Sequence, residues 1–267
     1  MSSKTAPPVH FSSRPAAIPL LFPNAPLQSL TTSQAHLALT TPLALKFPRS
    51  VSPFCAVREH TPEAIRQLAS LFEPGEASYI VLGENSTTSS RKSGTSEQNS
   101  ILCTTRFMPN FHVEGPFGVV QMLWPEDHPI PAPTPSASQI VPIGPSQAAE
   151  MVALTDIAFP GFFRIDTNRM GPYYCIRSET TGELLAMVGE RLNINNFREL
   201  SGLCTHPEHR GNGYGQHLMN HLLRIHKLNG YRTYLHASTP NTHAIHLYQR
   251  MGFILLEEFQ LLRLTLR

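Results

Sequence analysis

The chain has 267 residues, of which 41% are hydrophobic and 15% are charged, and its formal net charge at pH 7 is +2. This balance argues against a general nucleic-acid binder, because such proteins carry a concentrated basic face. No apolar run approaches the roughly 20 residues that span a bilayer. We therefore expect neither nucleic acid nor a membrane as a partner, and the sequence leaves the oligomeric state open.

The N-terminal region is rich in Ser, Pro and Ala, and the first 58 residues contain no Asp or Glu. We predict a disordered tail over residues 1–23 and a cytoplasmic protein. The alternative is an organelle transit peptide, which also avoids acids. The four cysteines form no Cys-x-x-Cys pair, which argues against a zinc site or a disulfide framework; they are Cys55, Cys103, Cys175 and Cys204.

Residues 24–124 are predicted to form an N-terminal α/β half. Thr61-Pro62-Glu63 has the pattern of a helix start, with Thr as the N-cap and Pro in the first turn, and Pro74-Gly75 ends that helix. Strands are predicted at 79–82, 101–108 and 117–124, with a polar surface loop at 84–100. Seven prolines in residues 125–145 indicate a linker to the next unit.

Residues 146–267 show regular helix and strand signals in the order α-β-β-β-α-β-α-β-β. Ser146 is expected to cap the first helix, which ends near residue 159. The other predicted elements are strands 173–177, 184–191 and 197–205, helix 213–228, strand 234–237, helix 241–251 and a final hairpin of 253–256 with 259–266.

The turn from Arg210 to Gly215, with the sequence Arg-Gly-Asn-Gly-Tyr-Gly, lies between a predicted strand and a helix. The first N–H groups of a helix have no partner inside it and attract anions, and glycines let the backbone approach a pyrophosphate closely. The dinucleotide-binding Gly-x-Gly-x-x-Gly pattern is broken at Gln216, and the Gly-Lys-Ser/Thr of a Walker loop is missing. Taken alone, the turn fits an anion site or a glycine-rich turn without a ligand.

Arg210-x-x-Gly213-x-Gly215 matches the Arg/Gln-x-x-Gly-x-Gly/Ala signature of the GNAT superfamily of N-acetyltransferases, which the chain resembles. Residues 241–253 resemble the second marker of that family, Asn-x-x-Ala-x-x-x-Tyr-x-x-x-Gly-Phe. The resemblance covers about 146–267, and 24–124 resembles the degenerate N-terminal half of two-part members. It implies a mixed α/β sheet that splays open between strands 197–205 and 233–238, flanked by helices.

The resemblance also implies acetyl-coenzyme A as the acetyl donor and an amine of a small molecule or peptide as the acceptor. The pantetheine arm would contact one strand and the start of a later helix, and backbone amides of the turn would hold the pyrophosphate. The implied cofactor-binding residues are Leu203, Cys204, Thr205, Arg210, Gly211, Asn212, Gly213, Tyr214, Gly215, Gln216 and Asn241.

By the same resemblance, Tyr248 is the candidate proton donor to the leaving thiolate, with a purely packing role as the alternative. The resemblance also makes Glu199 the candidate general base, with a solvent-facing strand glutamate as the alternative, and Glu190 is a second candidate. The aromatic loop 159–174 either lines the acceptor pocket or packs on the core. His217 and His221 have possible metal spacing, but the glutamate of a zincin motif is missing, so no metal is expected.

The predicted function is acetyl-coenzyme A-dependent N-acetylation of an amine. Two alternatives stay open: a coenzyme A-binding regulatory module without turnover, and an interaction scaffold that uses the Pro-rich segment 125–145.

Overall fold

The computed structural model describes residues 20–82, 108–132 and 139–267. The loop predicted at 84–100, most of the strand predicted at 101–108 and most of the predicted tail 1–23 lie outside these residues. Residues 20–22 are described, and they lie on the sheet: the Gln121 side chain accepts hydrogen bonds from the N–H groups of Leu21 and Phe22 at 2.8 and 3.1 Å. The part of the tail next to the first helix is therefore packed.

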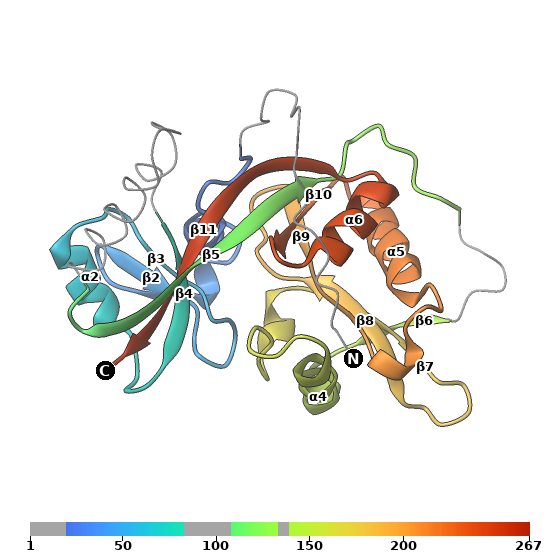
Figure 1. The fold of residues 1–267 in the computed structure, drawn as a ribbon, viewed down its shortest axis with the longest axis horizontal. Coiled ribbons are helices and arrows are strands. Elements are labelled where there is room, and N and C mark those ends of the chain that lie inside the picture. The colour runs from blue at the N-terminus through green and yellow to red at the C-terminus, as the bar shows by residue number, and fades with distance from the viewer. Residues whose placement is uncertain (1–19, 83–107, 133–138) are drawn as a thin grey trace, which may run out of the picture.

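One eight-stranded sheet runs through the molecule in the order β4-β11-β5-β10-β9-β8-β7-β6 (Figure 1). It is a mixed sheet, because β9 and β10 pair in parallel and the other neighbours pair antiparallel. This confirms the predicted mixed α/β class. The strands are β4 (Ala77–Val81), β5 (Phe111–Leu123), β6 (Ile140–Ile143), β7 (Tyr173–Arg177), β8 (Leu184–Glu190), β9 (Phe197–Thr205), β10 (Arg232–Ser238) and β11 (Ile254–Leu266).

The N-terminal lobe adds a small sheet to one end of the large one. The small sheet consists of β1 (Leu39–Thr40), β2 (Ala44–Lys46) and β3 (Cys55–Val57). The lobe also contains helices α1 (Ala25–Thr31) and α2 (Pro62–Ala69). Thr61 caps α2 as predicted, since its hydroxyl accepts the Ala64 N–H at 3.2 Å. A salt bridge of 2.5 Å joins Lys46 to Glu76 inside this lobe.

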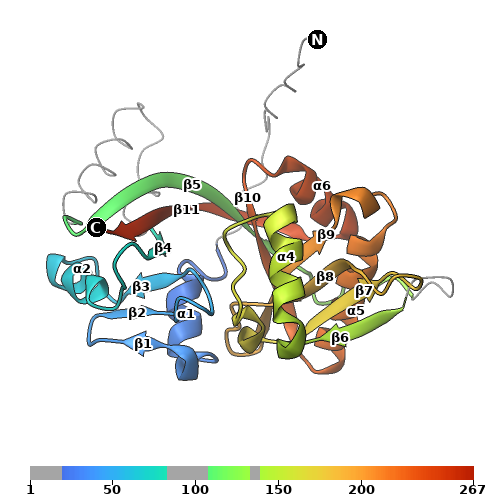
Figure 2. The ribbon, with the colours of Figure 1, turned by 90° about the horizontal axis from the view of Figure 1, so that it is seen from below.

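Helices cover both faces of the C-terminal part of the sheet (Figure 2). Side chains of α5 (Tyr214–Leu228) and α6 (Thr242–Met251) pack with Val188, Leu200 and Leu235. On the opposite face, α4 (Ala148–Ala158) packs with Tyr173, Cys175 and Met187. The predicted Ser146 cap of this helix is wrong: a 3-10 turn, Pro145–Gln147, precedes α4, and the Gln147 side chain accepts the Gly144 N–H.

Two long strands, β5 and β11, run across both lobes (Figures 1 and 2). β5 precedes the Pro-rich segment in sequence, yet it lies between β11 and β10 in the sheet. The hairpin predicted at the C-terminus is wrong, because Ile254–Leu266 is one strand with a register shift between Leu255 and Glu258. The residues between the two predicted strands, Glu257 and Glu258, are accommodated at a bulge, since β5 offers partners on both sides of it.

The Pro-rich segment also ends earlier than predicted. Residues 140–143 form β6, which pairs antiparallel with β7 at the edge of the sheet. Pro142 is tolerated there because an edge strand needs no N–H donor on its outer side. Within the residues that the structure describes, no helix is long and apolar enough to cross a membrane.

Candidate functional site

The sheet opens between β9 and β10. These strands pair only at their beginnings, where residues 197–199 face residues 232–234. The remaining residues, 200–205 of β9 and 235–238 of β10, form no pairs with each other, whereas both strands stay paired with their outer neighbours β8 and β5. The edge of β9 that faces β10 therefore offers backbone N–H and C=O groups to a ligand.

A β-bulge marks the open part of β9. Between the pairs Met187–Cys204 and Gly189–Ser201, β9 contains one residue more than β8. Gly202 has a φ of +62°, a conformation that favours glycine. A Cβ at Gly202 would stand 2.9 Å from the Tyr173 ring, and one at Gly189 would stand 2.4 Å from it. The two glycines thus let Tyr173 lie directly on β8 and β9 beside the opening.

The glycine turn lies at the start of α5, as the sequence predicts. Gly211 and Gly213 have φ angles of +85° and +76°, and no atom lies within 4 Å of the position that a Cβ would take at either. The first intrahelical bond runs from the His217 N–H to the Gly213 carbonyl at 3.0 Å. The N–H groups of residues 213–216 therefore have no partner within the helix and lie at its positive end, next to the open space beside Gly211 and Gly213. This is the arrangement of an anion site.

The residues predicted to hold the pantetheine arm lie close to this turn. Leu203, Cys204 and Thr205 form the open end of β9, and a Cβ on Gly215 would stand 3.9 Å from a methyl group of Leu203. Asn241 is the N-cap of α6, and its side chain accepts the Ala244 N–H at 3.2 Å. Its contact with the cofactor remains a prediction.

Tyr248 lies on α6 within the hydrophobic cluster that α5 and α6 form with the sheet. It is 9% exposed and lies 6.0 Å from the Phe253 ring. Burial raises the pKa of Tyr248 to about 12, which makes its hydroxyl a weaker acid than that of an exposed tyrosine. No described residue supplies a hydrogen-bond partner for this hydroxyl. The position is compatible with both the packing role and the predicted role as a proton donor.

Glu199 lies at the last position at which β9 pairs with β10, and it is completely buried. Its carboxylate accepts hydrogen bonds from Arg191 Nε and Nη2 at 3.0 and 2.6 Å, from the Leu192 N–H at 2.8 Å and from His236 Nδ1 at 2.8 Å. The solvent-facing alternative for Glu199 is therefore wrong.

Burial alone would raise the pKa of Glu199, but Arg191 and His236 outweigh this effect and lower the pKa to about 2. Four donors occupy the carboxylate, so direct proton abstraction would require this network to open. The geometry favours a structural ion pair, and the role of general base stays a prediction.

Glu190 belongs to a second buried network. One carboxylate oxygen lies 3.2 Å from His226 Nε2, and the other accepts a bond from Asn193 at 2.7 Å. His226 in turn contacts the Thr233 hydroxyl at 2.8 Å. Glu190 is 4% exposed, and both carboxylate oxygens have protein partners. Its role as the general base also stays a prediction.

Sequence reasoning missed the partners of Glu199. Arg191 and Glu199 flank the turn between β8 and β9, and the hairpin register could have placed them together. Gln121 orients His236. The Gln121 Oε1 atom accepts two backbone N–H groups, so Gln121 Nε2 donates to His236 Nε2 at 3.0 Å. Because His236 Nε2 accepts this bond, the proton of the ring is on Nδ1, which donates to Glu199.

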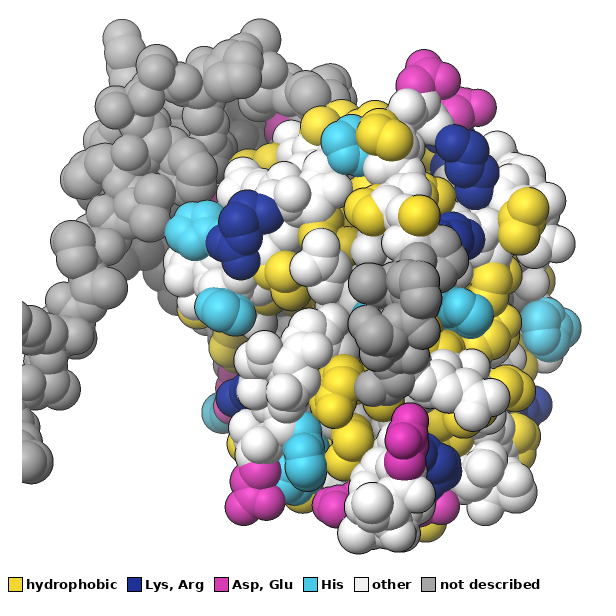
Figure 3. Space-filling model, turned by 90° about the vertical axis from the view of Figure 1, so that its right-hand side faces the viewer, with side chains coloured by type: hydrophobic (Ala, Val, Ile, Leu, Met, Phe, Trp, Pro, Cys, Tyr) yellow, Lys and Arg dark blue, Asp and Glu magenta, His cyan; other side chains and the backbone are white. Residues whose placement is uncertain are grey.

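Histidines form no metal centre in the part of the chain that the structure describes. His221 packs against the Tyr174 ring at 4.8 Å. On the face shown in Figure 3, lysines and arginines drawn in colour are scattered among apolar, histidine and other side chains and form no continuous patch. Cys55, Cys175 and Cys204 are buried free thiols, and Cys103 lies outside the described residues.

Residues 146–253 match the family model described as the acetyltransferase (GNAT) family. This part of the chain is a GNAT domain. A GNAT-family structure from Novosphingobium aromaticivorans, assigned as an acetyltransferase, aligns with 92% of this chain and 98% of its own at 27% identity and a TM-score of 0.74. A tandem GNAT protein from the clavulanic acid biosynthesis pathway shares the fold, at 14% identity and a TM-score of 0.51 over 84% of this chain and 79% of its own.

Among curated proteins, a spermidine N(1)-acetyltransferase from Vibrio cholerae is 41% identical over 59 residues, which are 20% of this chain. That match covers 34% of the relative's length, about a third of it. The chain is therefore similar to this enzyme over one segment of 59 residues.

Proposed function

We propose that the protein transfers the acetyl group of acetyl-coenzyme A to an amine of a small molecule or peptide. The observation that carries this proposal is the opening between β9 and β10, beside the N–H groups of residues 213–216 that have no partner within the helix. Membership of the GNAT family supports acetyl transfer. The spermidine N(1)-acetyltransferase match supports an amine as the acceptor and makes polyamines one candidate class.

The residues of the opening fit the cofactor. An extended amide-containing arm can form strand-like hydrogen bonds with Leu203, Cys204 and Thr205, because that edge of β9 has no strand partner. A pyrophosphate can lie against the N–H groups of residues 213–216, where glycines leave the space open. When bound, acetyl-coenzyme A would supply the thioester that the amine attacks.

The protein's chemical contribution is the control of charge and protons. A backbone N–H in the open part of β9 can donate a hydrogen bond to the thioester oxygen as it becomes negative. The Tyr248 hydroxyl, which like any tyrosine hydroxyl is protonated at neutral pH, can donate its proton to the leaving sulfur. The acceptor amine must be neutral to attack. It either loses its proton to Glu199 or Glu190, directly or through water, or enters already neutral.

The proposal is tested by measuring acetyl-coenzyme A turnover over a panel of amines, together with calorimetry of coenzyme A binding. We expect coenzyme A to bind and at least one amine class to be acetylated. Binding without turnover on any amine would instead support a regulatory coenzyme A-binding module. A folded protein that does not bind coenzyme A would refute the assignment of the site.

A further inference from the structure

The connection between α4 and β7, residues 159–172 of the GNAT domain, is held by the N-terminal lobe. The Asp166 N–H donates to the Ser50 carbonyl at 2.8 Å, and the Thr167 hydroxyl donates to the Val51 carbonyl at 2.7 Å. The Gln34 side chain donates to the Met170 carbonyl at 2.7 Å. The N-terminal lobe therefore fixes the conformation of this loop.

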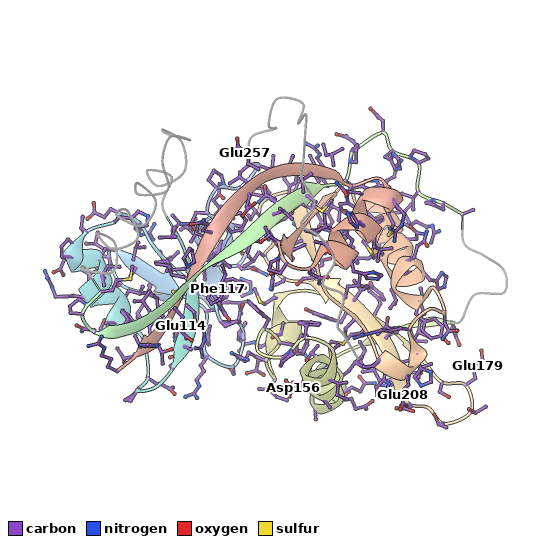
Figure 4. All side chains as sticks on the ribbon, viewed as in Figure 1. Glu114, Phe117, Asp156, Glu179, Glu208 and Glu257 are labelled. Atoms are coloured by element: carbon purple, nitrogen blue, oxygen red, sulfur yellow. The ribbon has the colours of Figure 1, made fainter. Side chains whose placement is uncertain are left out.

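Aromatic side chains from both lobes meet at this contact. Phe162 of the loop stacks on Tyr79 of β4, with ring centroids 4.8 Å apart and an interplanar angle of 18°. Phe54 lies 6.2 Å from Phe162, and Phe117 of β5 lies 6.2 Å from Tyr79. Phe117, labelled on β5 in Figure 4, is 43% exposed, so the edge of this aromatic cluster reaches solvent. The cluster consists of Phe54, Tyr79, Phe117 and Phe162.

Two contacts connect the cluster to the opening in the sheet. The Arg191 guanidinium lies 4.9 Å from the Phe54 ring centroid and pairs with Glu199, at the last position where β9 pairs with β10. Phe163, which follows Phe162, lies 5.5 Å from Tyr173. The Tyr173 ring in turn lies against Gly202 at the bulge. The loop is thus separated from the open part of β9 by one aromatic ring.

Arg164 follows these aromatic residues and lacks a carboxylate partner. Within the described residues, no Asp or Glu oxygen lies within 4 Å of its guanidinium, which donates to the Phe163 carbonyl at 3.4 Å. Asp156 of α4 (Figure 4) attracts it electrostatically without forming an ion pair. Burial is the main cause that lowers the pKa of Arg164. Arg49 and Arg263 lower it further, whereas Tyr79 and Asp156 oppose the shift.

The two neighbouring arginines are already neutralised. Arg49 pairs with Glu73 at 3.1 Å, and Arg263 pairs with Glu114 of β5. Arg164 is therefore a half-buried cation without an ion-pair partner among the described residues. It neighbours Tyr79 of the aromatic cluster, and it follows Phe163, whose ring packs against Tyr173 beside the opening. A guanidinium in such surroundings binds carboxylates with two parallel hydrogen bonds.

We propose that Arg164 and the aromatic cluster form the acceptor subsite, and that the acceptor amine carries a carboxylate together with an apolar side chain, as an amino acid or short peptide does. The carboxylate pairs with Arg164, and the apolar part packs on Phe162 and its neighbours. This inference rests on the proposed acetyltransferase function. It disfavours polyamines, whose additional ammonium groups would be repelled by Arg164.

The test compares matched acceptors with and without the carboxylate: phenylalanine against phenethylamine, and leucine against isoamylamine. The wild-type enzyme should show a kcat/KM about 10- to 100-fold higher for each amino acid, the range expected for hydrogen bonds to a charged group. Arg164→Ala should raise KM for the amino acids by a similar factor and remove the preference. Arg164→Lys should retain part of it, and Arg169→Ala, an exposed arginine on the same loop, should leave it unchanged.

Calorimetry with N-acetylphenylalanine, the expected product, gives a readout that does not need turnover. The coenzyme A-loaded wild type should bind it, and the Arg164→Ala variant should bind it about 10- to 100-fold more weakly while its melting temperature and coenzyme A affinity stay unchanged. Equal rates within each acceptor pair, fast acetylation of spermidine, or undiminished binding by the variant would overturn the inference and leave the proposed function standing. Product binding without acetylation of any amine would overturn the proposed function alone.

Discussion

Replacing Glu199 with Gln should destabilise the protein strongly. The variant removes the negative charge that faces Arg191 and leaves a guanidinium buried without its counter-ion. Breaking a buried ion pair by removing one partner costs about 3–5 kcal/mol. The pKa of Glu199 gives a second estimate: a decrease from 4.5 to about 2, at 1.36 kcal/mol per unit, corresponds to about 3 kcal/mol. The two estimates agree in order of magnitude.

The sign of the pH dependence follows from the same pKa. Glu199 is more acidic in the folded protein than in the unfolded chain, so its contribution is complete above pH 4.5. It is lost progressively as the pH falls from 4.5 through the folded pKa of about 2. The wild type should therefore lose stability over this window, and Glu199→Gln should lack that part of the loss.

The assay is chemical unfolding of the wild type, Glu199→Gln and the exposed control Glu183→Gln between pH 7 and pH 2. Adding Arg191→Met to Glu199→Gln should recover part of the lost stability, because no unpaired charge then remains. A loss below about 1 kcal/mol in the single variant, well under the expected cost, would refute the ion-pair assignment. The same variant also tests catalysis: a base would show a lower kcat/KM at pH 7 that recovers as the pH rises, whereas equal loss at every pH argues against a base.

Three further substitutions test the site. Gly213→Glu should abolish coenzyme A binding, while Gly213→Ala, with the same unfavourable φ but no charge, should retain most of it in calorimetry; equal affinities would reject the pyrophosphate site. Tyr248→Phe should lower kcat by roughly 10²-fold with little change in KM, and an unchanged kcat with rate-limiting chemistry would leave only a packing role. Gly202→Ala should cost more stability than Gly75→Ala, because both have positive φ but only the former meets Tyr173; equal unfolding midpoints would contradict this.

Local signals were sufficient to predict the elements around the site. The strands Tyr173–Arg177 and Phe197–Thr205 have the predicted bounds, and α5 begins within one residue of its predicted start. These elements end at glycines, caps and turns whose preferences act over a few residues. The glycine turn was predictable for the same reason, since positive φ angles at Gly211 and Gly213 are what their residue type allows.

Elements that depend on distant partners were predicted poorly. The bulge in β11 resembles a turn until β5, more than a hundred residues away in sequence, supplies partners on both sides of it. β6 resembles a linker because Pro142 is acceptable only at a sheet edge. Glu199 fits a base by position, but its burial and its pairing with Arg191 and His236 are properties of the folded chain.

The two strands shared by the lobes have a consequence for biosynthesis. β4, the edge strand of the large sheet that adjoins the N-terminal lobe, pairs with residues 261–265 of β11, and β11 pairs in turn with β5. During translation, β4 therefore lacks its partner strand β11 until residue 265 has been synthesised. Exposed strand edges favour aggregation. We therefore expect a nascent chain stalled before residue 254 to depend on chaperones, although nearly all of its N-terminal lobe has already been made.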